Sequence, residues 1–195
     1  MTTIFLIRHA ETDAVGKWIA GWTPGVHLNR VGVTQADRLA DRLATTQIRA
    51  IYSSPLERAI ETAQPLATRL RLPIVEREPL GEIHFGNWTA RALAELDADP
   101  EWRLFNSFRS AHRIPGGESM LEVQSRLVSE LTCLAQRHPD ETIAAVSHGD
   151  VIRAAVAHYL GAPLDLIVRF EISPASVTTL RLSEETAVLL CLNEA

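Results

Sequence analysis

The sequence has few cysteines, no excess of positive charge and no long apolar run, and each shortage excludes a class of protein. Cys133 and Cys191 are the only cysteines and form no C-x-x-C motif, so we expect neither a disulfide framework nor a thiolate zinc site. The formal net charge of -5 argues against nucleic acid or an anionic membrane as a partner. No apolar run reaches bilayer length, and Met1–Thr3 lacks the positive region of a secretory signal. We therefore expect a cytoplasmic protein whose anion site, if it has one, is local.

The order of short apolar runs and helical patterns predicts the fold class. With 195 residues and 46% hydrophobic content, the chain can form a single domain (1–195) that buries roughly 70% of its unfolded surface. Alternating strands and helices predict an α/β fold, a three-layer α/β/α sandwich around a mostly parallel sheet. The expected strands are Thr3–Ile7, Ala50–Tyr52, Leu72–Val75, Thr142–Val146, Ser176–Leu182 and Val188–Leu192. The expected helices are Thr34–Ala44, Ser54 to about Leu70, Glu118–Arg137 and about Asp150 to Leu160.

Local signals predict where some helices begin and where a segment is inserted. Ser54 is typical of an N-cap with Pro55 at the first helical position, and Asn29 and Gly32 are expected as turn residues before a helix. The stretch from Gly86 to about Phe108 is helical in pattern, interrupted by Pro100 and rich in aromatics. We expect it to form a short helical cover at about residues 84–115. Its aromatic residues are interpreted as packing; they are Trp88, Trp102, Phe105 and Phe108.

Two histidines follow buried strands, which is where open α/β sheets carry their chemistry. Arg8 and His9 come directly after the first strand, and His148 follows the strand Thr142–Val146. Ser53, Arg58 and Glu82 are expected at the same sheet edge. Guanidinium forks match phosphate oxygens, and the N-termini of the following helices add backbone donors. One imidazole can attack phosphorus, the other can hold a phosphoryl oxygen, and the Glu82 carboxyl can protonate the leaving oxygen. Glu118 and Glu11 are the alternative carboxylates for this pocket.

Motifs spread along the chain resemble the phosphoglycerate mutase-like branch of the histidine phosphatase superfamily. They occupy Leu6–Thr12, Leu28–Ala36, Ile51–Ala59, Glu61–Ala63, Leu80–Trp88, Gly116–Ser119 and Val146–Gly149. The resemblance implies that His9 is phosphorylated, that Arg8 and Arg58 clamp the phosphoryl group, and that His148 stabilises it. It further implies that Glu82 is the proton donor and later the base. Thr12 and Gly149 are expected to contact the substrate, and no metal or organic cofactor is implied.

Three positions depart from the usual pattern of that family. Ala10 replaces the commoner glycine, and Val15 replaces an asparagine that contacts phosphate in many members. Ala90 stands where a glycine often follows the tryptophan of the cover motif, so the path of that segment is expected to differ slightly. We expect catalysis to survive these changes.

Two other hydrolytic mechanisms match parts of the sequence poorly. His9-Ala10-Glu11 fits the H-x-E pattern of zinc deaminases, but the Pro-Cys-x-x-Cys partner is absent. Ser147 stands in a near copy of a nucleophile elbow, but the first glycine is missing and His158 is the only histidine downstream.

Within the resembled superfamily, a phosphomonoesterase that hydrolyses a small organic phosphate is favoured. A mutase needs further cations for a doubly anionic substrate, and the candidates are Arg91, Arg103, Arg109 and Arg113. Acidic neighbours offset them, and the aromatic rim favours an organic group of some apolar character. The alternatives are phosphoglycerate mutase-type transfer, a non-catalytic phosphate-binding module and a protein phosphatase. Sugar phosphates, phosphoglycerates, nucleotides and α-ribazole phosphate remain open as substrates, and the closing strand Val188–Leu192 could pair two copies as a homodimer.

Overall fold

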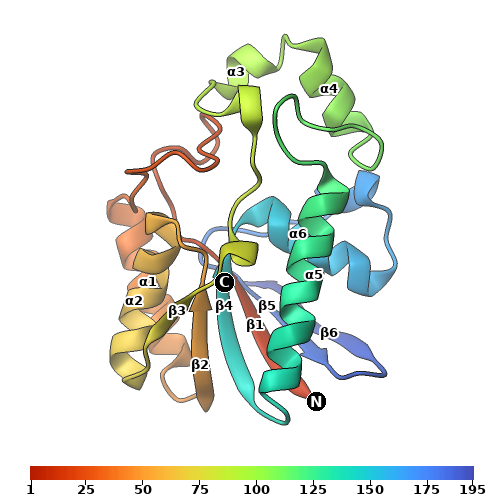
Figure 1. The fold of residues 1–195 in the computed structure, drawn as a ribbon. Coiled ribbons are helices and arrows are strands. Elements are labelled where there is room, and N and C mark those ends of the chain that lie inside the picture. The colour runs from red at the N-terminus through yellow and green to blue at the C-terminus, as the bar shows by residue number, and fades with distance from the viewer.

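The computed structural model describes residues 1–195 and places six strands in one sheet (Figure 1). The strands are β1 (Thr2–Arg8), β2 (Ile48–Ser53), β3 (Ile74–Glu76), β4 (Thr142–Ser147), β5 (Val177–Leu182) and β6 (Ala187–Glu194). Their spatial order is β3-β2-β4-β1-β5-β6. Strands β3, β2, β4 and β1 are parallel, whereas β5 and β6 are antiparallel to their neighbours. The expected mostly parallel sheet is confirmed.

Helices cover both faces of this sheet, which confirms the three-layer architecture (Figure 1). The α-helices are α1 (Arg30–Leu43), α2 (Glu57–Leu70), α3 (Leu93–Leu96), α4 (Pro100–Ser107), α5 (Met120–Arg137) and α6 (Gly149–Leu160). Three 3₁₀ helices are η1 (Glu78–Leu80), η2 (Gly86–Trp88) and η3 (Leu164–Arg169). Helices α1 and α2 lie on one face, α5 and α6 lie on the other, and α3 and α4 lie beyond the carboxyl ends of the parallel strands.

Successive side chains of the central strands point to opposite faces of the sheet and pack into two separate apolar cores. Ile4 and Leu6 of β1 pack into the larger core with α5 and α6, whereas Ile7 packs into the smaller core with α1 and α2. In β4, Ala145 and Ala144 divide in the same way. A strand buried on both faces must be apolar at every position, which explains the continuous hydrophobic runs in the sequence.

The starts of two helices differ from the sequence-based prediction. Helix α2 begins at Glu57, its N-cap is Leu56, and no side chain caps it, so Ser54 as N-cap is wrong. Ser54 Oγ instead accepts a hydrogen bond from Leu56 N and contacts His148. Helix α1 begins at Arg30, because Asn29 Oδ1 accepts from Gly32 N at 2.9 Å and caps the helix.

Gly32 is therefore a residue of the first turn of α1 and not a turn residue before it. A Cβ at Gly32 would lie 2.1 Å from the carbonyl oxygen of Glu11. The missing side chain thus lets α1 approach the loop that follows β1, which packs this helix close to the end of the central strand.

Smaller shifts of one or two residues occur elsewhere. β3 covers Ile74–Glu76 in place of Leu72–Val75. α5 begins at Met120 because Ser119 and Glu122 form a reciprocal capping box. Pro100 is the first residue of α4 and is preceded by the N-cap Asp99, so the proline starts a helix after a break.

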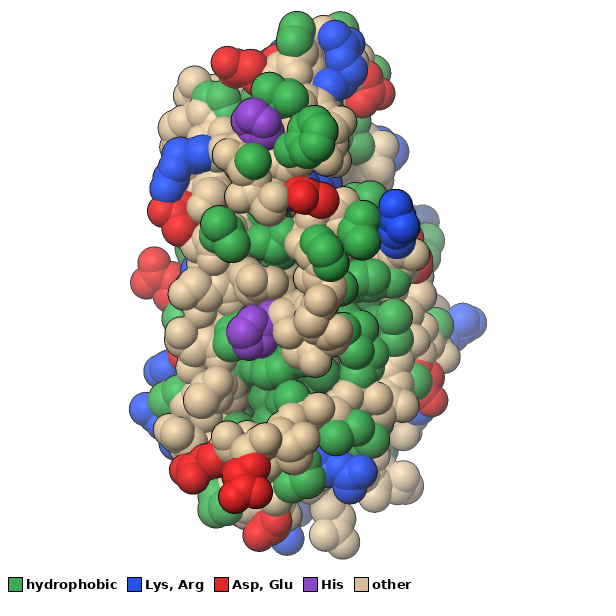
Figure 2. Space-filling view, turned by 90° about the vertical axis from the view of Figure 1, so that its right-hand side faces the viewer, with side chains coloured by type: hydrophobic (Ala, Val, Ile, Leu, Met, Phe, Trp, Pro, Cys, Tyr) green, Lys and Arg blue, Asp and Glu red, His purple; other side chains and the backbone are tan.

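Strand β6 lies at the edge of the sheet, as the last strand of the spatial order. Its side chains Val188 and Leu190 are exposed, and Figure 2 shows apolar side chains scattered among polar ones on this side of the molecule. Pairing of two copies through β6 stays a prediction. None of the helices combines the length and the apolar character needed to span a bilayer.

Candidate active site

The carboxyl ends of the neighbouring strands β1 and β4 bring three of the predicted site residues together. Arg8 at the end of β1 is in register with Ser147 at the end of β4, and His9 N donates to Ser147 O at 2.9 Å. His148 follows at once, and its ring centroid lies 5.2 Å from that of His9. Two imidazoles that are 139 positions apart in the chain therefore face one space.

His9 is held in one tautomer. Its Nδ1 donates to the carbonyl oxygen of Ala10 at 2.8 Å, so the lone pair is on Nε2. Burial, followed by the nearby Arg58 guanidinium, lowers the pKa of His9 to about 3. A neutral imidazole with a free Nε2 is the form that can act as a nucleophile at neutral pH.

Arg58 is buried and Arg8 is half-buried, and each guanidinium has a buried donor that is unused. Arg58 is 1% exposed, and its Nη2 donates to Gly21 O at 2.9 Å. Arg8 Nη1 donates to Ile172 O at 2.6 Å. Neither Nη1 of Arg58 nor Nε of Arg8 has an acceptor in the protein. Buried donors without acceptors are unfavourable, and an anion bound between these side chains would supply the missing acceptors.

His148 is fully buried and is oriented by two hydrogen bonds. Arg58 Nη2 donates to its Nδ1 at 3.3 Å, and its Nε2 donates to Ser54 Oγ at 2.8 Å. Burial, and then the charge of Arg58, holds the pKa of His148 well below its ordinary value. The side chain that sequence analysis assigned to a helix cap thus positions the second imidazole.

Glu82 completes the inner part of the site. Its Oε2 lies 3.5 Å from His148 Nδ1 and 3.9 Å from Arg58 Nη2, and Oε1 accepts from Ile83 N at 3.0 Å. Burial raises the pKa of Glu82, and the Arg58 charge opposes that shift only in part. The carboxyl is therefore tuned toward its protonated form, as a proton donor requires.

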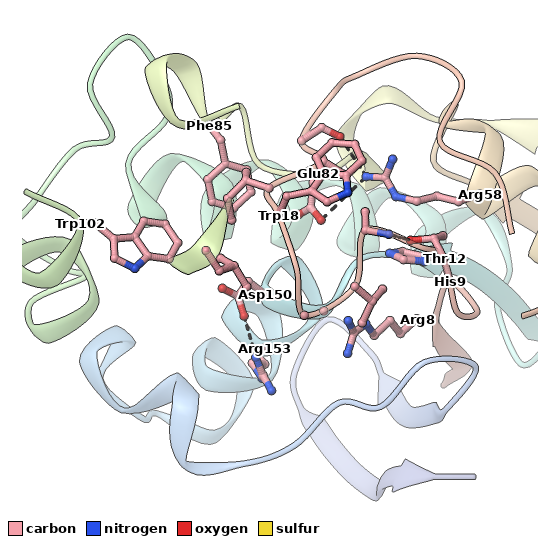
Figure 3. A pocket seen from close by; sticks show the side chains of 18 of the residues that line it. Arg8, His9, Thr12, Trp18, Arg58, Glu82, Phe85, Trp102, Asp150 and Arg153 are labelled. Atoms are coloured by element: carbon pink, nitrogen blue, oxygen red, sulfur yellow. Dashed lines mark hydrogen bonds and ion pairs between the residues drawn. The ribbon is translucent and has the colours of Figure 1, made fainter. Parts of the chain in front are cut away.

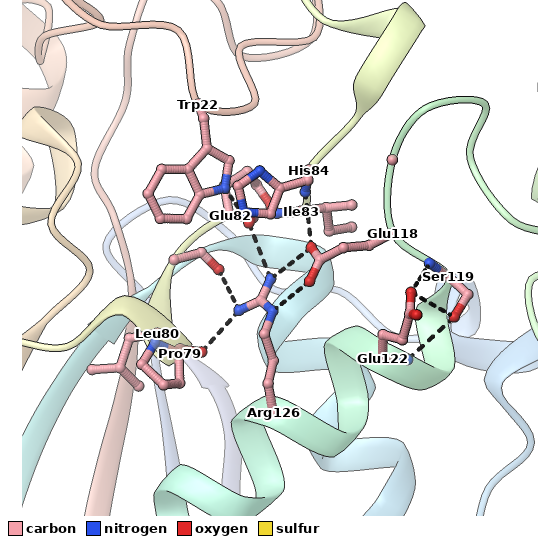
Figure 4. Close-up of polar contacts among 12 residues, drawn as sticks. Trp22, Pro79, Leu80, Glu82, Ile83, His84, Glu118, Ser119, Glu122 and Arg126 are labelled. Carbon is pink, nitrogen blue, oxygen red and sulfur yellow. Dashed lines mark hydrogen bonds and ion pairs between the residues drawn. The ribbon is translucent and has the colours of Figure 1, made fainter.

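The backbone of Glu82 is fixed by residues that sequence analysis missed (Figure 4). Its carbonyl oxygen accepts from Trp22 Nε1 at 2.7 Å and from Arg126 Nη2 at 3.0 Å. Arg126 Nε also pairs with Glu118 at 2.9 Å. Glu118 is thus an anchor for Arg126, and neither Glu118 nor Glu11 lines the pocket. No local pattern marks Arg126, because both Glu118 and the backbone carbonyls that it contacts lie outside its own helix.

A cavity of about 280 Å³ opens above these groups (Figure 3). Thr12 and Gly149 both line it, and a Cβ at Gly149 would lie 3.2 Å from Arg8 Nε. Val15 also lines the cavity, at the position where many members of the resembled family have an asparagine that contacts phosphate. Its outer wall is aromatic and includes Trp18 and Phe85, which the sequence did not single out, together with Trp102 and Phe105.

The aromatics of the expected cover differ in their surroundings. Trp88 is 2% exposed and packs edge-on against Trp102 and Phe105. Both of those partners pack on it and line the pocket as well. Phe108 is exposed and lies outside the pocket. The interpretation as packing therefore describes only part of what Trp102 and Phe105 do.

Of the four arginines considered as second anion contacts, only Arg109 lines the pocket. It pairs with Asp150 at 2.6 Å, and Arg153 pairs with the other oxygen of the same carboxylate at 2.8 Å. Burial alone would raise the pKa of Asp150, but the two positive charges stabilise its ionised form more strongly and lower the pKa to about 2. The remaining three pair with groups of their own segment or of its flank: Arg91 with Asp99, Arg113 with Glu122, and Arg103 with Asp97 O.

The donor atoms of His9, Glu82 and His148 lie within 4.8 Å of one another, a spacing that can hold a metal ion. However, the positive charges of Arg58 and Arg8 adjoin this cluster and act on both imidazoles. A cation there would be repelled, whereas a phosphoryl dianion would be attracted. Ser147, the alternative nucleophile, is fully buried and donates to Leu80 O at 2.7 Å, so its hydroxyl is not directed into the pocket.

Comparison with known proteins agrees with this geometry. The model of the histidine phosphatase superfamily, branch 1, matches residues 4–195. Phosphoserine phosphatase 1 of Hydrogenobacter thermophilus is 31% identical over 197 residues, covering 99% of this chain and 92% of that protein. Probable phosphoglycerate mutase GpmB of Proteus mirabilis is 33% identical over 168 residues, 84% and 77% of the two chains. The solved structure of YhfR from Bacillus stearothermophilus superposes with a TM-score of 0.94 at 30% identity, covering 100% and 98% of the two chains.

Proposed function

We propose that this chain works through a phosphohistidine on His9. It belongs to the histidine phosphatase superfamily, branch 1, and is a phosphomonoesterase of small organic phosphates. The observation that carries this proposal is the state of His9: a neutral imidazole whose Nε2 lone pair is free, beside the guanidiniums of Arg58 and Arg8, each of which has a buried donor without an acceptor. A weakly basic nitrogen next to fixed positive charge is poor at binding protons, yet it is well placed to attack an anionic phosphorus centre.

The proposed first step forms a P–N bond between the substrate phosphorus and His9 Nε2 while the P–O bond to the organic group breaks. Arg8 and Arg58 neutralise the phosphoryl oxygens as charge spreads over them. Glu82 gives its proton to the departing oxygen, so the product leaves as a neutral alcohol. His148 places its Nδ1 beside Glu82 and Arg58, and its hydrogen bond to Ser54 holds the ring in this orientation.

In the proposed second step, water attacks the same phosphorus from the side that the alcohol has left. Glu82, now ionised, takes the proton of that water, and the P–N bond breaks to restore neutral His9 and release inorganic phosphate. Thr12 and Gly149 line the wall beside the phosphoryl group and are proposed as substrate contacts. We further propose that residues 84–115 are the cover of the pocket, since Phe85, Trp102 and Phe105 all line it.

Hydrolysis is proposed over mutase-type transfer because the cover supplies only one arginine to the pocket, and that arginine is already paired with a carboxylate. A mutase must hold a doubly anionic substrate and shield its phosphohistidine from water. Arg109 is the one cover arginine at the pocket, and Asp150 neutralises it. A second anionic group on the substrate would thus meet a single guanidinium on the cover, that of Arg109, whose Nη1 and Nη2 are occupied and whose Nε alone has no acceptor.

The test is direct detection of the covalent intermediate. The enzyme is mixed with p-nitrophenyl phosphate, quenched in base, in which phosphohistidine survives, and its intact mass and peptides are measured. We expect one added phosphoryl group on the peptide that contains His9, and loss of both label and turnover in His9→Ala. The matched control is Ser147→Ala, which removes the alternative nucleophile and should keep both. Turnover that survives in His9→Ala, or label on another residue, would overturn the proposal.

A further inference from the structure

The carboxyl group of Glu82 lies near the Arg58 guanidinium without a hydrogen bond to it. Its Oε2 is 3.9 Å from Arg58 Nη2, which is about 1 Å longer than a charge-assisted hydrogen bond. The buried Nη1 of the same guanidinium has no acceptor in the protein. Opposite charges attract strongly where water is excluded. A small movement of an ionised Glu82 would therefore close an ion pair that occupies Arg58 and leaves no proton to donate.

The backbone around Glu82 is held by the side chain of Arg126 on α5 (Figure 4). Arg126 Nη1 donates to Pro79 O at 2.8 Å and to Gly81 O at 2.9 Å, and Nη2 donates to Glu82 O at 3.0 Å. The remaining donors go to Glu118, from Nε at 2.9 Å and from Nη2 at 3.1 Å. All five N–H groups of the guanidinium are thus used, and three of them bind carbonyls of one short segment.

Glu118 and Trp22 hold the same segment through further contacts. Glu118 Oε2 also accepts from His84 N at 2.8 Å, so the ion pair with Arg126 binds the segment at its far end as well. Trp22 Nε1 donates to the carbonyl of Glu82 at 2.7 Å, and its ring stacks on His84 with centroids 4.6 Å apart. None of these anchoring side chains lines the pocket, so they act on the segment and not on the substrate.

We propose that Arg126 is a positioning residue that keeps the acid apart from the phosphate-binding guanidinium, because it holds the backbone of Glu82 where the carboxylate cannot pair with Arg58. Arg58 then stays free for the phosphoryl group, and Glu82 stays free to protonate the leaving oxygen. This inference deepens the proposed function and rests on it.

The charged surroundings of the Glu82 carboxyl single out Arg58 as the cation that would capture it. The titratable and charged groups that face this carboxyl are Arg58 of α2, Arg8 and His9 at the end of β1, and His148 and Asp150 at the start of α6. Arg58 is the only arginine within 4 Å of the carboxyl. Loss of the Arg126 anchor should therefore lead to one particular ion pair, and its consequences can be measured.

The test compares two substrates in wild type and in Arg126→Gln. The leaving group of 2-phenylethyl phosphate needs a proton, whereas that of p-nitrophenyl phosphate does not. We expect the ratio of their kcat/KM values, alkyl to aryl, to fall by about tenfold or more, the scale of a misplaced catalytic group. The inhibition constant of inorganic phosphate should rise several-fold because Arg58 is occupied. An unchanged ratio, with phosphohistidine still formed on His9, overturns the inference and leaves the proposed function intact; absence of phosphohistidine in wild type overturns both.

The pH profile separates the position of Glu82 from the charge of Arg126. Removal of a nearby positive charge would by itself raise the pKa of the carboxyl, so the alkaline limb of kcat/KM for 2-phenylethyl phosphate would move to higher pH. An ion pair with Arg58 lowers that pKa, so the limb should instead move to lower pH in Arg126→Gln. Arg126→Lys keeps the charge but lacks the five-donor fork, and it should shift the limb in the same direction by less. An upward shift in Arg126→Gln overturns the inference.

A double substitution separates this role from a general loss of structure. In Glu82→Gln no carboxylate remains to pair with Arg58, so adding Arg126→Gln should change the ratio and the phosphate inhibition by less than about twofold. A further fall as large as in the wild-type background overturns the inference.

Two more variants guard against failure of Arg126→Gln to fold. Trp22→Phe removes the other side-chain donor to Glu82 O and should lower the alkyl-to-aryl ratio in the same direction; an unchanged ratio there counts against the inference. The matched control is Arg113→Gln, which breaks an exposed ion pair with Glu122 in the first turn of the same helix and has no hydrogen bond to residues 79–84. Its ratio should equal that of wild type, and an equal fall in this control would show that any disturbance of α5 has the same effect.

Discussion

Replacing Glu82 by Gln should separate proton donation from every other role of this side chain. Gln is nearly the same size, and its Oε1 can still accept from Ile83 N, as the carboxylate does at 3.0 Å. The side chains of Trp22 and Arg126 donate hydrogen bonds to the main-chain carbonyl of this residue, and the substitution leaves those bonds unchanged. What disappears is an acid whose pKa burial has raised, 3.5 Å from His148 Nδ1.

The expected loss depends on the substrate's leaving group. General acid catalysis contributes about 10²- to 10⁴-fold, which is roughly 3–5 kcal/mol of transition-state stabilisation. An alkoxide is a poor leaving group, so Glu82→Gln should lose that full factor in kcat/KM with 2-phenylethyl phosphate. Nitrophenolate leaves without a proton, so kcat/KM with p-nitrophenyl phosphate should fall by less than about tenfold.

The second half of the reaction supplies an internal control. Without Glu82 as base, water attacks the phosphohistidine slowly, so Glu82→Gln should release a burst of nitrophenol that approaches one equivalent of enzyme, followed by a slow steady rate. Stopped-flow absorbance measures both phases. Equal losses of kcat/KM for the alkyl and aryl substrates, or no burst, would show that Glu82 is not the acid and base, and the reasoning from its raised pKa would be refuted.

Three further predictions concern the rest of the site and its support. Ala90 has a left-handed backbone with φ of 65°, so Ala90→Gly should stabilise the protein by about 1 kcal/mol and raise Tm by roughly 2–4 °C in calorimetry; a lower Tm would contradict this. Gly149→Ala places a Cβ 3.2 Å from Arg8 Nε, so KM should rise about tenfold in steady-state assays, and an unchanged KM would show that Arg8 yields freely. Because burial lowers the pKa of His9 from 6.5 to about 3, only the unfolded chain binds a proton there as the pH falls below 6.5. The free energy of unfolding should thus fall by about 2–3 kcal/mol more in wild type than in His9→Gln between pH 7 and about pH 4.5, measured by urea titration, and parallel curves would exclude a buried neutral His9.

The sheet and the inner site could be predicted because both follow from the same signal. A run that is apolar at every position predicts a strand buried on both faces, and parallel strands end at one edge. Polar residues directly after such runs, as at Arg8–His9 and Ser147–His148, are therefore expected to meet. The pairing of β1 with β4 confirms that geometry, with Arg8 opposite Ser147.

The start of α2 could not be predicted in the same way, because a tertiary contact overrides the local signal. Ser54 followed by Pro55 is a good N-cap pattern, yet its hydroxyl bonds to His148 Nε2. A local preference worth about 1 kcal/mol gives way to a buried hydrogen bond that orients the second imidazole. Arg126 was missed for a related reason, since its donors serve carbonyls of a loop distant in sequence.

The outer pocket was the least predictable part because it is assembled from segments that share no pattern. Trp18 comes from the loop after β1, Trp102 from α4, and Asp150 from the first turn of α6. Asp150 looks like an ordinary acidic residue near a helix N-terminus, where such residues are favoured by the helix dipole. Only the positions of Arg109 and Arg153 reveal that it pairs with two guanidiniums.

The electrostatics of the inner site follow from where the fold places it. β1 and β4 lie at the centre of the sheet, so residues at their ends are covered by α2 and α6 as well as by the loops above. That covering removes water from both imidazoles and from Glu82, and it moves their pKa values in opposite senses: the pKa values of the histidines fall and that of the carboxyl rises. At an exposed sheet edge the same residues would keep their ordinary pKa values, so a larger share of the histidines would be protonated and Glu82 would be more readily ionised. The central position of β1 and β4 therefore favours the neutral imidazole and the protonated carboxyl that the proposed mechanism requires.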